Sequence, residues 1–304
     1  MQLRVLGSAA GGGYPQWNCN CPRCQQARGG GLSDQCRTQS SIAVSADGRH
    51  WLLVNASPDI RQQILDTPAL HPSTGLRGSG IAAVLLADSQ LDHVTGLVML
   101  RESHHPLSIY CTPRTEEDLR TGFPVLNILI HYCGTQVHPL RLDGTAVEPA
   151  ETPGVRVTAI PLKSKAPPYS PHRAAPEPGD NLGFFFHSAE GDGGVFYAPG
   201  LGDMDDSLLP WMARANVLLV DGTTWTDDEM QRVVGGRKTA REMGHLPQSG
   251  AHGTMALLAQ YPKARRILIH INNTNPILDP ASEERAALEQ AGIETAHDGM
   301  HIPF

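Results

Sequence analysis

The fold is decided by a short polar loop that follows a buried strand, Asp88-Ser89-Gln90-Leu91-Asp92-His93. The preceding residues, 81–87, are apolar throughout, and the lack of alternating polar positions predicts a strand covered on both faces. Loops after such strands are held rigidly at the edge of a sheet, where functional side chains gather. Because this loop ends in a carboxylate beside an imidazole, Asp92 and His93, the sequence predicts a metal-binding loop.

A second apolar strand supplies another imidazole. Residues 266–269 are followed at once by His270. Asp92, His93 and His270 together offer two imidazoles and one carboxylate, the facial triad that suits ferrous iron with open coordination positions. The alternative is a structural role, in which Asp92 bonds to a helix N-terminus and the two histidines are simply buried.

Composition limits the remaining classes. The chain has 304 residues, 40% of them hydrophobic, which is enough for one large domain or two small ones. Its net charge is −7 and it has no long basic run, so a nucleic-acid partner is not expected. No apolar stretch reaches the roughly 18 residues of a membrane span, and the first residues do not resemble a signal peptide. We therefore expect a cytoplasmic protein without a membrane span.

Three cysteines lie close together, Cys19, Cys21 and Cys24. Their C-x-C-x-x-C spacing falls in a polar loop that offers no core in which to bury three thiols. It therefore favours thiolates converging on one metal over buried thiols or a disulfide framework. A closed tetrahedral zinc would suit them, and it would contribute to folding and not to chemistry.

Predicted strands outnumber predicted helices. Strands are expected at residues 3–8, 41–45, 51–55, 107–111, 155–160, 181–187, 194–197 and 216–220. Helices are expected at residues 57–65, 114–121, 253–260 and 282–291. Hairpins come first and crossovers later, which indicates an α+β fold with two mixed sheets face to face, helices outside, and a single domain over residues 1–304. Residues 163–180 contain five prolines and are expected to form an ordered loop over a site.

The loop of residues 88–93, followed by Gly96, resembles the metallo-β-lactamase superfamily signature H-x-H-x-D-H-x-x-G. Asp92 and His93 match its ligand positions, while Asp88 and Gln90 stand where the first two histidines would be. Further motifs occur in the order found in the phosphodiesterase branch of that superfamily. They are the cysteine loop, Asp221 at the end of an apolar strand, Gly244-His245, His270 and Asp298-Gly299-Met300.

Four segments are more specifically similar to the pyrroloquinoline quinone biosynthesis protein B family. They are residues 11–19, 37–41, 89–93 and 270–276. This resemblance implies an αββα four-layer sandwich. It also implies a role in making the redox cofactor pyrroloquinoline quinone (PQQ) from a peptide precursor.

The resemblance further implies that one of two metal sites has been lost as a set. The histidines of the first site are replaced by Asp88 and Gln90, no histidine lies near Ser164, and Gly200 stands at the bridging aspartate. Two-metal hydrolysis needs a hydroxide held between two ions, so hydrolysis is not expected. Asp88 and Gln90 either point into the vacated pocket, toward substrate or a metal-bound water, or satisfy loop amides.

The related phosphodiesterases take a fourth zinc ligand from a histidine three places after the counterpart of His270. Here that position is Asn273. The fourth ligand of the cysteine site is therefore left open between the Asn273 oxygen, Cys36, a water and His301.

Asp221 and His245 resemble a pair that lies beside the metals in the phosphodiesterase branch. A carboxylate partner raises the pKa of an imidazole, so this pair is expected to serve as acid or base, with Gln90 as a third candidate catalytic residue. A buried structural hydrogen bond is the alternative role for the pair.

The resulting hypothesis is an iron- and oxygen-dependent hydroxylase acting on the tyrosine-derived ring of a small diamino-acid precursor of PQQ. Zinc is expected to compete for the iron site. A different class, a non-catalytic carrier that moves PQQ or its precursor toward the periplasm, is the alternative, and a residual hydrolase is a third. A carrier needs no redox metal, whereas a hydrolase needs the second ion. Expected partners are the precursor or PQQ, other proteins of the pathway, and a second copy in a homodimer.

Overall fold

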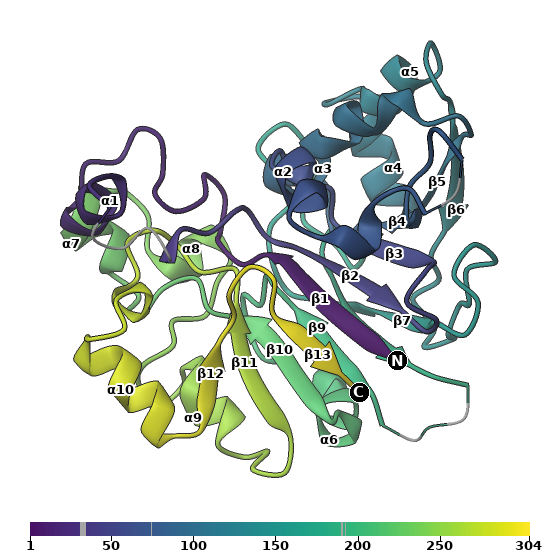
Figure 1. Cartoon of the computed structure of the whole chain (residues 1–304). Coiled ribbons are helices and arrows are strands. Elements are labelled where there is room, and N and C mark those ends of the chain that lie inside the picture. Colours follow the sequence, from purple (N-terminus) through teal and green to yellow (C-terminus); the bar gives the residue numbers. More distant parts are fainter. Residues whose placement is uncertain (31–34, 74, 190, 192) are drawn as a thin grey trace.

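Two β-sheets lie face to face at the centre of the computed structural model, which describes residues 1–30, 35–73, 75–189, 191 and 193–304 (Figure 1). The first sheet has the strand order β13-β1-β2-β3-β4-β5-β6. Its strands are β13 (His301–Pro303), β1 (Gln2–Gly7), β2 (Ser41–Ser45), β3 (Trp51–Val54), β4 (Ile81–Leu85), β5 (Leu107–Cys111) and β6 (Thr135–Pro139). The second has the order β12-β11-β10-β9-β8-β7. Its strands are β12 (Ile293–Thr295), β11 (Arg265–Ile269), β10 (Val217–Asp221), β9 (Val195–Ala198), β8 (Leu182–His187) and β7 (Arg156–Pro161).

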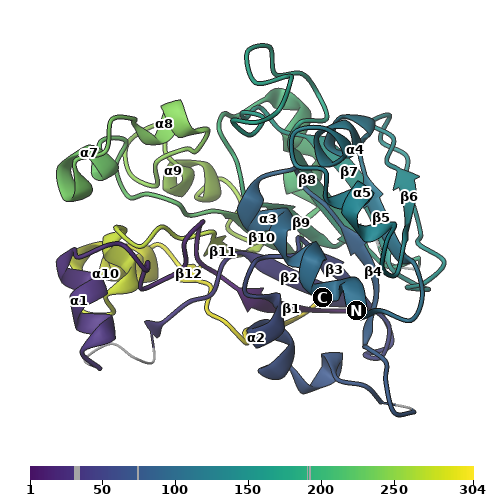
Figure 2. The same ribbon diagram turned by 90° about the horizontal axis from the view of Figure 1, so that it is seen from above.

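Helices cover the outer face of each sheet (Figures 1 and 2). The first sheet carries α2 (Ile60–Leu65), η2 (Pro68–Leu70), α3 (Leu91–Val94), η3 (Thr95–Glu102), α4 (Pro113–Arg120) and α5 (Val125–Leu129). The second carries η4 (Asp206–Leu208), α6 (Leu209–Arg214), α9 (Thr254–Leu258), η5 (Pro276–Leu278) and α10 (Glu283–Gln290). Three short helices gather at one end of the second sheet, α1 (Pro22–Arg28), α7 (Glu229–Val234) and α8 (Ala240–Met243). Among the described residues, no helix has both the length and the apolar content needed to cross a bilayer.

Three apolar cores hold these layers together. One lies between the two sheets and includes Val5, Leu85 and Phe184. A second lies under the helices of the first sheet, around Trp51 and Leu126, and a third lies between the second sheet and its helices. Burial of apolar area between layers is the main stabilising term in such a fold. The expected α+β class with an αββα four-layer sandwich is confirmed.

Strand direction explains where functional residues can meet. In the first sheet β4 runs parallel to β3 and β5, and in the second β10 runs parallel to β9 and β11. The carboxyl ends of these parallel strands therefore share one edge of the sandwich. Residues that follow β4, β10 and β11 project from that edge, and these are the positions of Asp88, Asp221 and His270.

The helix expected from Ser57 begins later, at Ile60. The Ser57 hydroxyl does not cap a helix, because it donates to the Gln63 side chain and accepts from the Asp59 amide. The edge strands β6, β12 and β13 were not expected, because they are short or polar and have no period-two apolar pattern. Pairing with a neighbouring strand, which only the folded chain provides, is what makes them strands.

Candidate metal centre

Asp92, His93 and His270 come together at the shared edge of the two sheets. Asp92 and His93 lie in α3, which begins at Leu91, after the loop that follows the end of β4 at Leu85. His270 directly follows β11 and adopts a left-handed backbone conformation with φ of 60°. One ligand atom from each of the three residues lies within 4.8 Å of the other two. One carboxylate oxygen and two imidazole nitrogens at this spacing can hold a single divalent cation.

His93 is oriented by the carboxylate of Asp88. Its Nδ1 donates to Asp88 Oδ1 over 2.7 Å, which leaves Nε2 as the side that bears the lone pair. That Nε2 is buried and has no hydrogen-bond partner among the described residues, and it lies 3.8 Å from Asp92 Oδ2. A buried polar atom without a partner is costly in a folded protein. A metal ion would satisfy it, and a carboxylate behind a ligating imidazole is a common second partner of such sites.

His270 is oriented in a similar way by a hydroxyl. Its Nδ1 donates to Thr223 Oγ1 over 3.0 Å, and its Nε2 lies 3.5 Å from Asp92 Oδ2. The two histidine rings meet edge to face, 5.6 Å apart. Both imidazoles therefore turn Nε2 toward the same carboxylate, so the donor set fits a metal ion by its chemistry and by its orientation.

The charges of this cluster attract a cation. Burial disfavours a charged Asp92, but His93 and His270 outweigh it and hold the pKa of that carboxyl well below its usual range. Burial also disfavours a charged His93, but Asp88 and Asp92 outweigh it and raise its pKa to about 9. Two carboxylates thus face one imidazole, an arrangement that favours a positive charge there, whether carried by a proton or by a metal.

Asp221 and His245 form a second polar unit beside the first. Asp221 is fully buried, and its two oxygens accept four hydrogen bonds. They come from Leu201 N, Thr223 N, Thr223 Oγ1 and His245 Nδ1, the last over 2.6 Å. Although Asp221, His245 and His270 could also surround a metal, a carboxylate with every acceptor position in use is a poor ligand.

His245 therefore acts as a partner of the centre more readily than as part of a second ion site. Its ring stacks on that of His270 at 5.2 Å. Burial lowers the pKa of His245, but the Asp221 carboxylate outweighs it and the net shift is upward. Because Nδ1 is held by Asp221, the Nε2 atom is the one that can exchange a proton.

Thr223 connects the two units and was not expected from the sequence. Its hydroxyl has two possible acceptors, Asp221 Oδ1 at 2.6 Å and His270 O at 3.0 Å, and the shorter contact with a charged oxygen makes Asp221 the acceptor. The same oxygen then accepts from His270 Nδ1, at 3.0 Å. A threonine two residues after an aspartate at a strand end is too common a pattern to single out, so only the fold reveals this role.

The residues at the vacated metal site do not converge on a second ion. Asp88 satisfies the Gln90 amide, at 2.9 Å, as well as His93, so it serves the loop and the ligand. The Gln90 side chain donates to Lys165 O at 3.1 Å. Ser164 Oγ donates to Gly244 O. At Gly200 no described atom lies within 4 Å of the position that a Cβ would take, so a side chain would fit there but is missing.

The loop of residues 163–180 closes over this region, as expected. Tyr169 donates to Ser89 O, and Gln90 to Lys165 O, so the loop is tied to the metal-binding segment at two points. Its far end is held by Arg114, whose Nε lies 2.6 Å from Asp180 Oδ1. The loop is therefore fixed beside the Asp92–His93 segment at one end and to α4 at the other.

The thiols of Cys19, Cys21 and Cys24 lie within 4.8 Å of one another, at the start of α1. The Asn273 side-chain nitrogen lies 3.4 Å from Cys24 Sγ and donates to it. Of the other candidates for a fourth ligand, His301 is on β13 and bonds to Gln2. Cys36 lies outside the cluster of three thiols. Three thiolates with this spacing fit a zinc ion.

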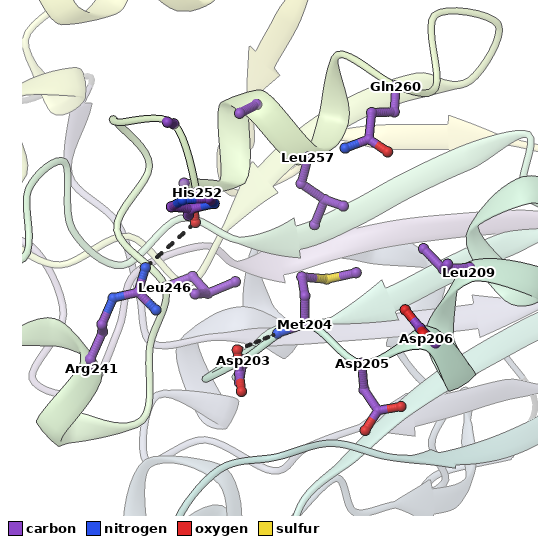
Figure 3. Close-up of a pocket in the computed structure, with 13 residues that line it drawn as sticks. Asp203, Met204, Asp205, Asp206, Leu209, Arg241, Leu246, His252, Leu257 and Gln260 are labelled. Atoms are coloured by element: carbon purple, nitrogen blue, oxygen red, sulfur yellow. Dashed lines mark hydrogen bonds between the residues drawn. The ribbon is translucent and has the colours of Figure 1, made fainter.

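A hollow of about 670 Å³ opens elsewhere, between residues 203–209 and 241–260 (Figure 3). Leu246 and Leu257 form part of its wall, and Arg241 reaches across to His252 O at 3.5 Å. None of the candidate metal ligands lines it. The candidate metal centre is therefore separate from this hollow, although Leu246 in the wall of the hollow directly follows His245 in the chain.

Comparison with known proteins defines the class first. Residues 50–271 match the family model of the Beta-lactamase superfamily domain. A diphosphatase from the PhnP family shares the fold with a TM-score of 0.69 at 20% identity, covering 100% of this chain and 96% of that chain. Human tRNase Z, short form, shares it with a TM-score of 0.58 at 16% identity, covering 100% and 99%. The fold is that of the metallo-β-lactamase superfamily.

Closer relatives define the family. Coenzyme PQQ synthesis protein B of Pseudomonas paraeruginosa is 56% identical over 99% of both chains, and that of Methylococcus capsulatus is 52% identical over 99% of both. The crystal structure of Zn(2+)-bound PqqB from Methylobacterium extorquens superimposes with a TM-score of 0.88 at 40% identity, covering 100% of both chains. The chain belongs to the coenzyme PQQ synthesis protein B family, and the resemblance seen in its motifs is confirmed.

Proposed function

We propose that this chain acts in the synthesis of coenzyme PQQ, in the cytoplasm, as a metal-dependent hydroxylase. One observation carries the proposal: both His93 and His270 have Nδ1 held by a partner and turn Nε2 toward Asp92. Family membership supports the pathway. The spacing of ligands supports a metal-dependent role, because three ligands on one side of an ion leave other positions open.

Asp92, His93 and His270 would hold ferrous iron, which supplies open positions for dioxygen and substrate when bound. The proposed substrate is the tyrosine-derived ring of a small diamino-acid precursor. Zinc competes for the same imidazole and carboxylate ligands, because it binds them more tightly than ferrous iron does. We therefore expect protein purified in air to carry zinc at this site and to be inactive toward oxygen.

The chain's own residues would position the substrate and move protons. His245, held by Asp221 at 2.6 Å, would exchange a proton with the substrate at Nε2, and the Asp221 carboxylate, which raises the pKa of His245, makes the imidazole a stronger base. Gln90 would keep the loop of residues 163–180 closed through Lys165 O. Hydrolysis is not proposed, because Asp88 and Gln90 are engaged elsewhere and position 200 has no carboxylate.

At the second cluster, Cys19, Cys21 and Cys24 would hold a zinc ion with a structural role. A zinc-bound relative supports zinc in this family. Asn273 is close enough to complete the site, although its amide nitrogen, not its oxygen, faces the thiol. With the amide nitrogen held on the thiol, the fourth position would be filled by a water.

The test is metal analysis of protein purified and reconstituted without oxygen, combined with oxygen consumption in the presence of a dihydroxyphenylalanine-like substrate. Iron-loaded protein should consume oxygen and form a hydroxylated product. The variants His93→Ala and His270→Ala should lose iron and turnover together, because two remaining ligands hold ferrous iron weakly. Wild-type turnover in both variants, or full activity of iron-free zinc protein, would overturn the proposal. Binding of PQQ without any turnover would make the carrier the leading hypothesis.

A further inference from the structure

The two candidate metal sites share one turn of the chain. His270, a ligand of the first cluster, and Asn273, which touches the second, are three residues apart. Both residues are buried, with 5% and 3% of their surface exposed. The two ends of this turn are therefore joined by a short covalent path.

The turn has little freedom to absorb such a change. Asn272 N donates to Thr223 O at 3.0 Å, and Asn275 Nδ2 donates to Gly222 O at 3.0 Å. Thr274 Oγ1 donates to the buried Glu229 carboxylate at 2.6 Å. Because each residue of the turn is bonded to a neighbouring element, the segment should move as one body.

The loop that carries the thiols also touches the first cluster directly. Ala10 N donates to Ile271 O at 2.9 Å, and Arg23 Nη1 donates to Thr274 O at 3.1 Å. A Cβ added at Gly11 would lie 3.1 Å from Asp92 Oδ2, so the backbone of this loop packs against the carboxylate. The loop that carries the thiols thus contacts both the turn of residues 270–275 and the Asp92 carboxylate.

We propose that metal occupancy of the thiol site raises the metal affinity of the Asp92–His93–His270 site, and that Asn273 is the positioning residue that links them. The proposal rests on the two metal sites of the proposed function. It does not depend on the reaction. The physical step is a change in one hydrogen bond, from the Asn273 amide to Cys24 Sγ.

Metal binding converts Cys24 from a thiol to a thiolate. A hydrogen bond to an ionised acceptor is about twice as strong as one to a neutral acceptor. The Asn273 amide is then held more firmly, and the turn with it. His270 needs that support, because its backbone is held in a left-handed conformation that few residues with a Cβ adopt. An ordered His270 binds metal without the loss of entropy that a mobile ligand would suffer.

The test measures Mn²⁺ binding at the triad by electron paramagnetic resonance, with the thiol site either stripped or loaded with one equivalent of Zn²⁺. Zinc prefers the thiolates and manganese prefers oxygen and imidazole ligands, so the two probes separate. In the wild type, zinc should lower the Kd for Mn²⁺ by about tenfold, within the usual range of coupling between sites. In Asn273→Ala the effect of zinc should shrink to about twofold or less.

Asn127→Ala is the matched control, because Asn127 donates to Arg120 O on the surface, far from the turn in sequence. It should keep the full effect of zinc. Coupling must be reciprocal, so Mn²⁺ should raise the zinc affinity of the wild type by the same factor, a measurement that needs no variant. An unchanged Kd for Mn²⁺ with and without zinc would overturn the coupling alone. Absence of Mn²⁺ binding in both states would overturn the coupling and the proposed function together.

Discussion

The carboxylate of Asp88 accepts a hydrogen bond from Nδ1 of His93 at a distance of 2.7 Å. At a position where the superfamily signature has a metal-binding histidine, this chain therefore has a residue that orients the remaining ligand. A single replacement, aspartate for histidine at position 88, therefore removes one ligand of the signature and orients another, His93. Under the proposed function, this relationship makes Asp88 a partner of the Asp92–His93–His270 cluster and not a remnant of a second metal site.

Asp88→Asn should weaken metal binding at the triad by about 10- to 100-fold, the usual effect of removing a partner behind a ligating histidine. The amide keeps the shape of the side chain but loses the charge that favours His93 in its present orientation. Isothermal titration with Mn²⁺ measures the change. Asp66→Asn, at an exposed carboxylate bonded to Gln62, is the control and should bind normally. An Asp88→Asn variant with wild-type affinity would contradict this role.

Thr223→Val should also weaken metal binding, by about tenfold. Valine has nearly the same shape but cannot accept from His270 Nδ1 or donate to Asp221. Thr223→Ser restores the hydroxyl and should recover most of the affinity. Comparison of the two variants by metal titration, with circular dichroism to verify folding, separates the hydroxyl from the packing. Equal affinities for Val and Ser would show that the hydroxyl is not needed.

The metal-free protein should lose stability as pH rises. Asp88 and Asp92 outweigh burial and raise the pKa of His93 from 6.5 to about 9. Since the folded pKa lies above the unfolded one, the stabilisation is complete below about pH 6.5 and is lost as pH rises through about 9. Urea unfolding across this range, with a chelator present, measures the slope. His93→Gln should lack this contribution, and parallel profiles for the two proteins would contradict it. Bound metal should reverse the trend, because it competes with the proton.

Tyr169→Phe should loosen the loop of residues 163–180, because it removes the hydrogen bond to Ser89 O. Limited proteolysis should cut this loop faster in the variant, whereas Tyr132→Phe, at an exposed tyrosine, should leave the rate unchanged. The free energy of unfolding should change by only about 1 kcal/mol, as for a single hydrogen bond. Identical cleavage patterns in all three proteins would mean that Tyr169 does not hold the loop.

Restoring Asp88→His and Gln90→His should not create a hydrolase. Asp88→His removes the partner of His93, so the first ion should bind more weakly even if a second one is drawn in. Adding Gly200→Asp should improve binding of the second ion, because there is open space for a side chain at that position. The measurements are the metal content of each variant and its rate of hydrolysis of a phosphodiester substrate. Efficient hydrolysis by the double variant without Gly200→Asp would refute the need for a bridging carboxylate.

The sequence was sufficient to predict the buried strands and the residues that follow them. Residues 81–87 are apolar without a break, and their burial pattern places Asp88 at a sheet edge as expected. Motif spacing also identified the four-layer fold through the family resemblance, which the comparisons confirm. The short edge strands β6 and β13 could not be predicted, because their pairing depends on neighbours far away in the sequence.

The sequence motifs did not predict contacts between side chains that are distant in the sequence. Thr223 meets His270 across 47 positions, and Asn273 meets Cys24 across 249. Neither pairing leaves a local pattern. The parallel pairing of β10 with β11 places Thr223 beside His270, and the packing of α1 near the turn after β11 places Cys24 beside Asn273. Asp88 is a different case: its identity was noticed, but a carboxylate can serve an amide, a water or an imidazole equally well, and only its geometry decides.

The left-handed backbone at His270 sets two demands against each other. Asn55 has nearly the same backbone conformation, with φ of 62°, but asparagine is a residue that often occupies it. At position 270 the backbone would be equally satisfied by glycine or asparagine, whereas the proposed metal site requires an imidazole. Mutation alone should therefore tend to erase this ligand while sparing the fold. We expect that some homologues of this chain keep the intact fold but bind no metal at this cluster. The residue at position 270 should distinguish them from the homologues that bind metal.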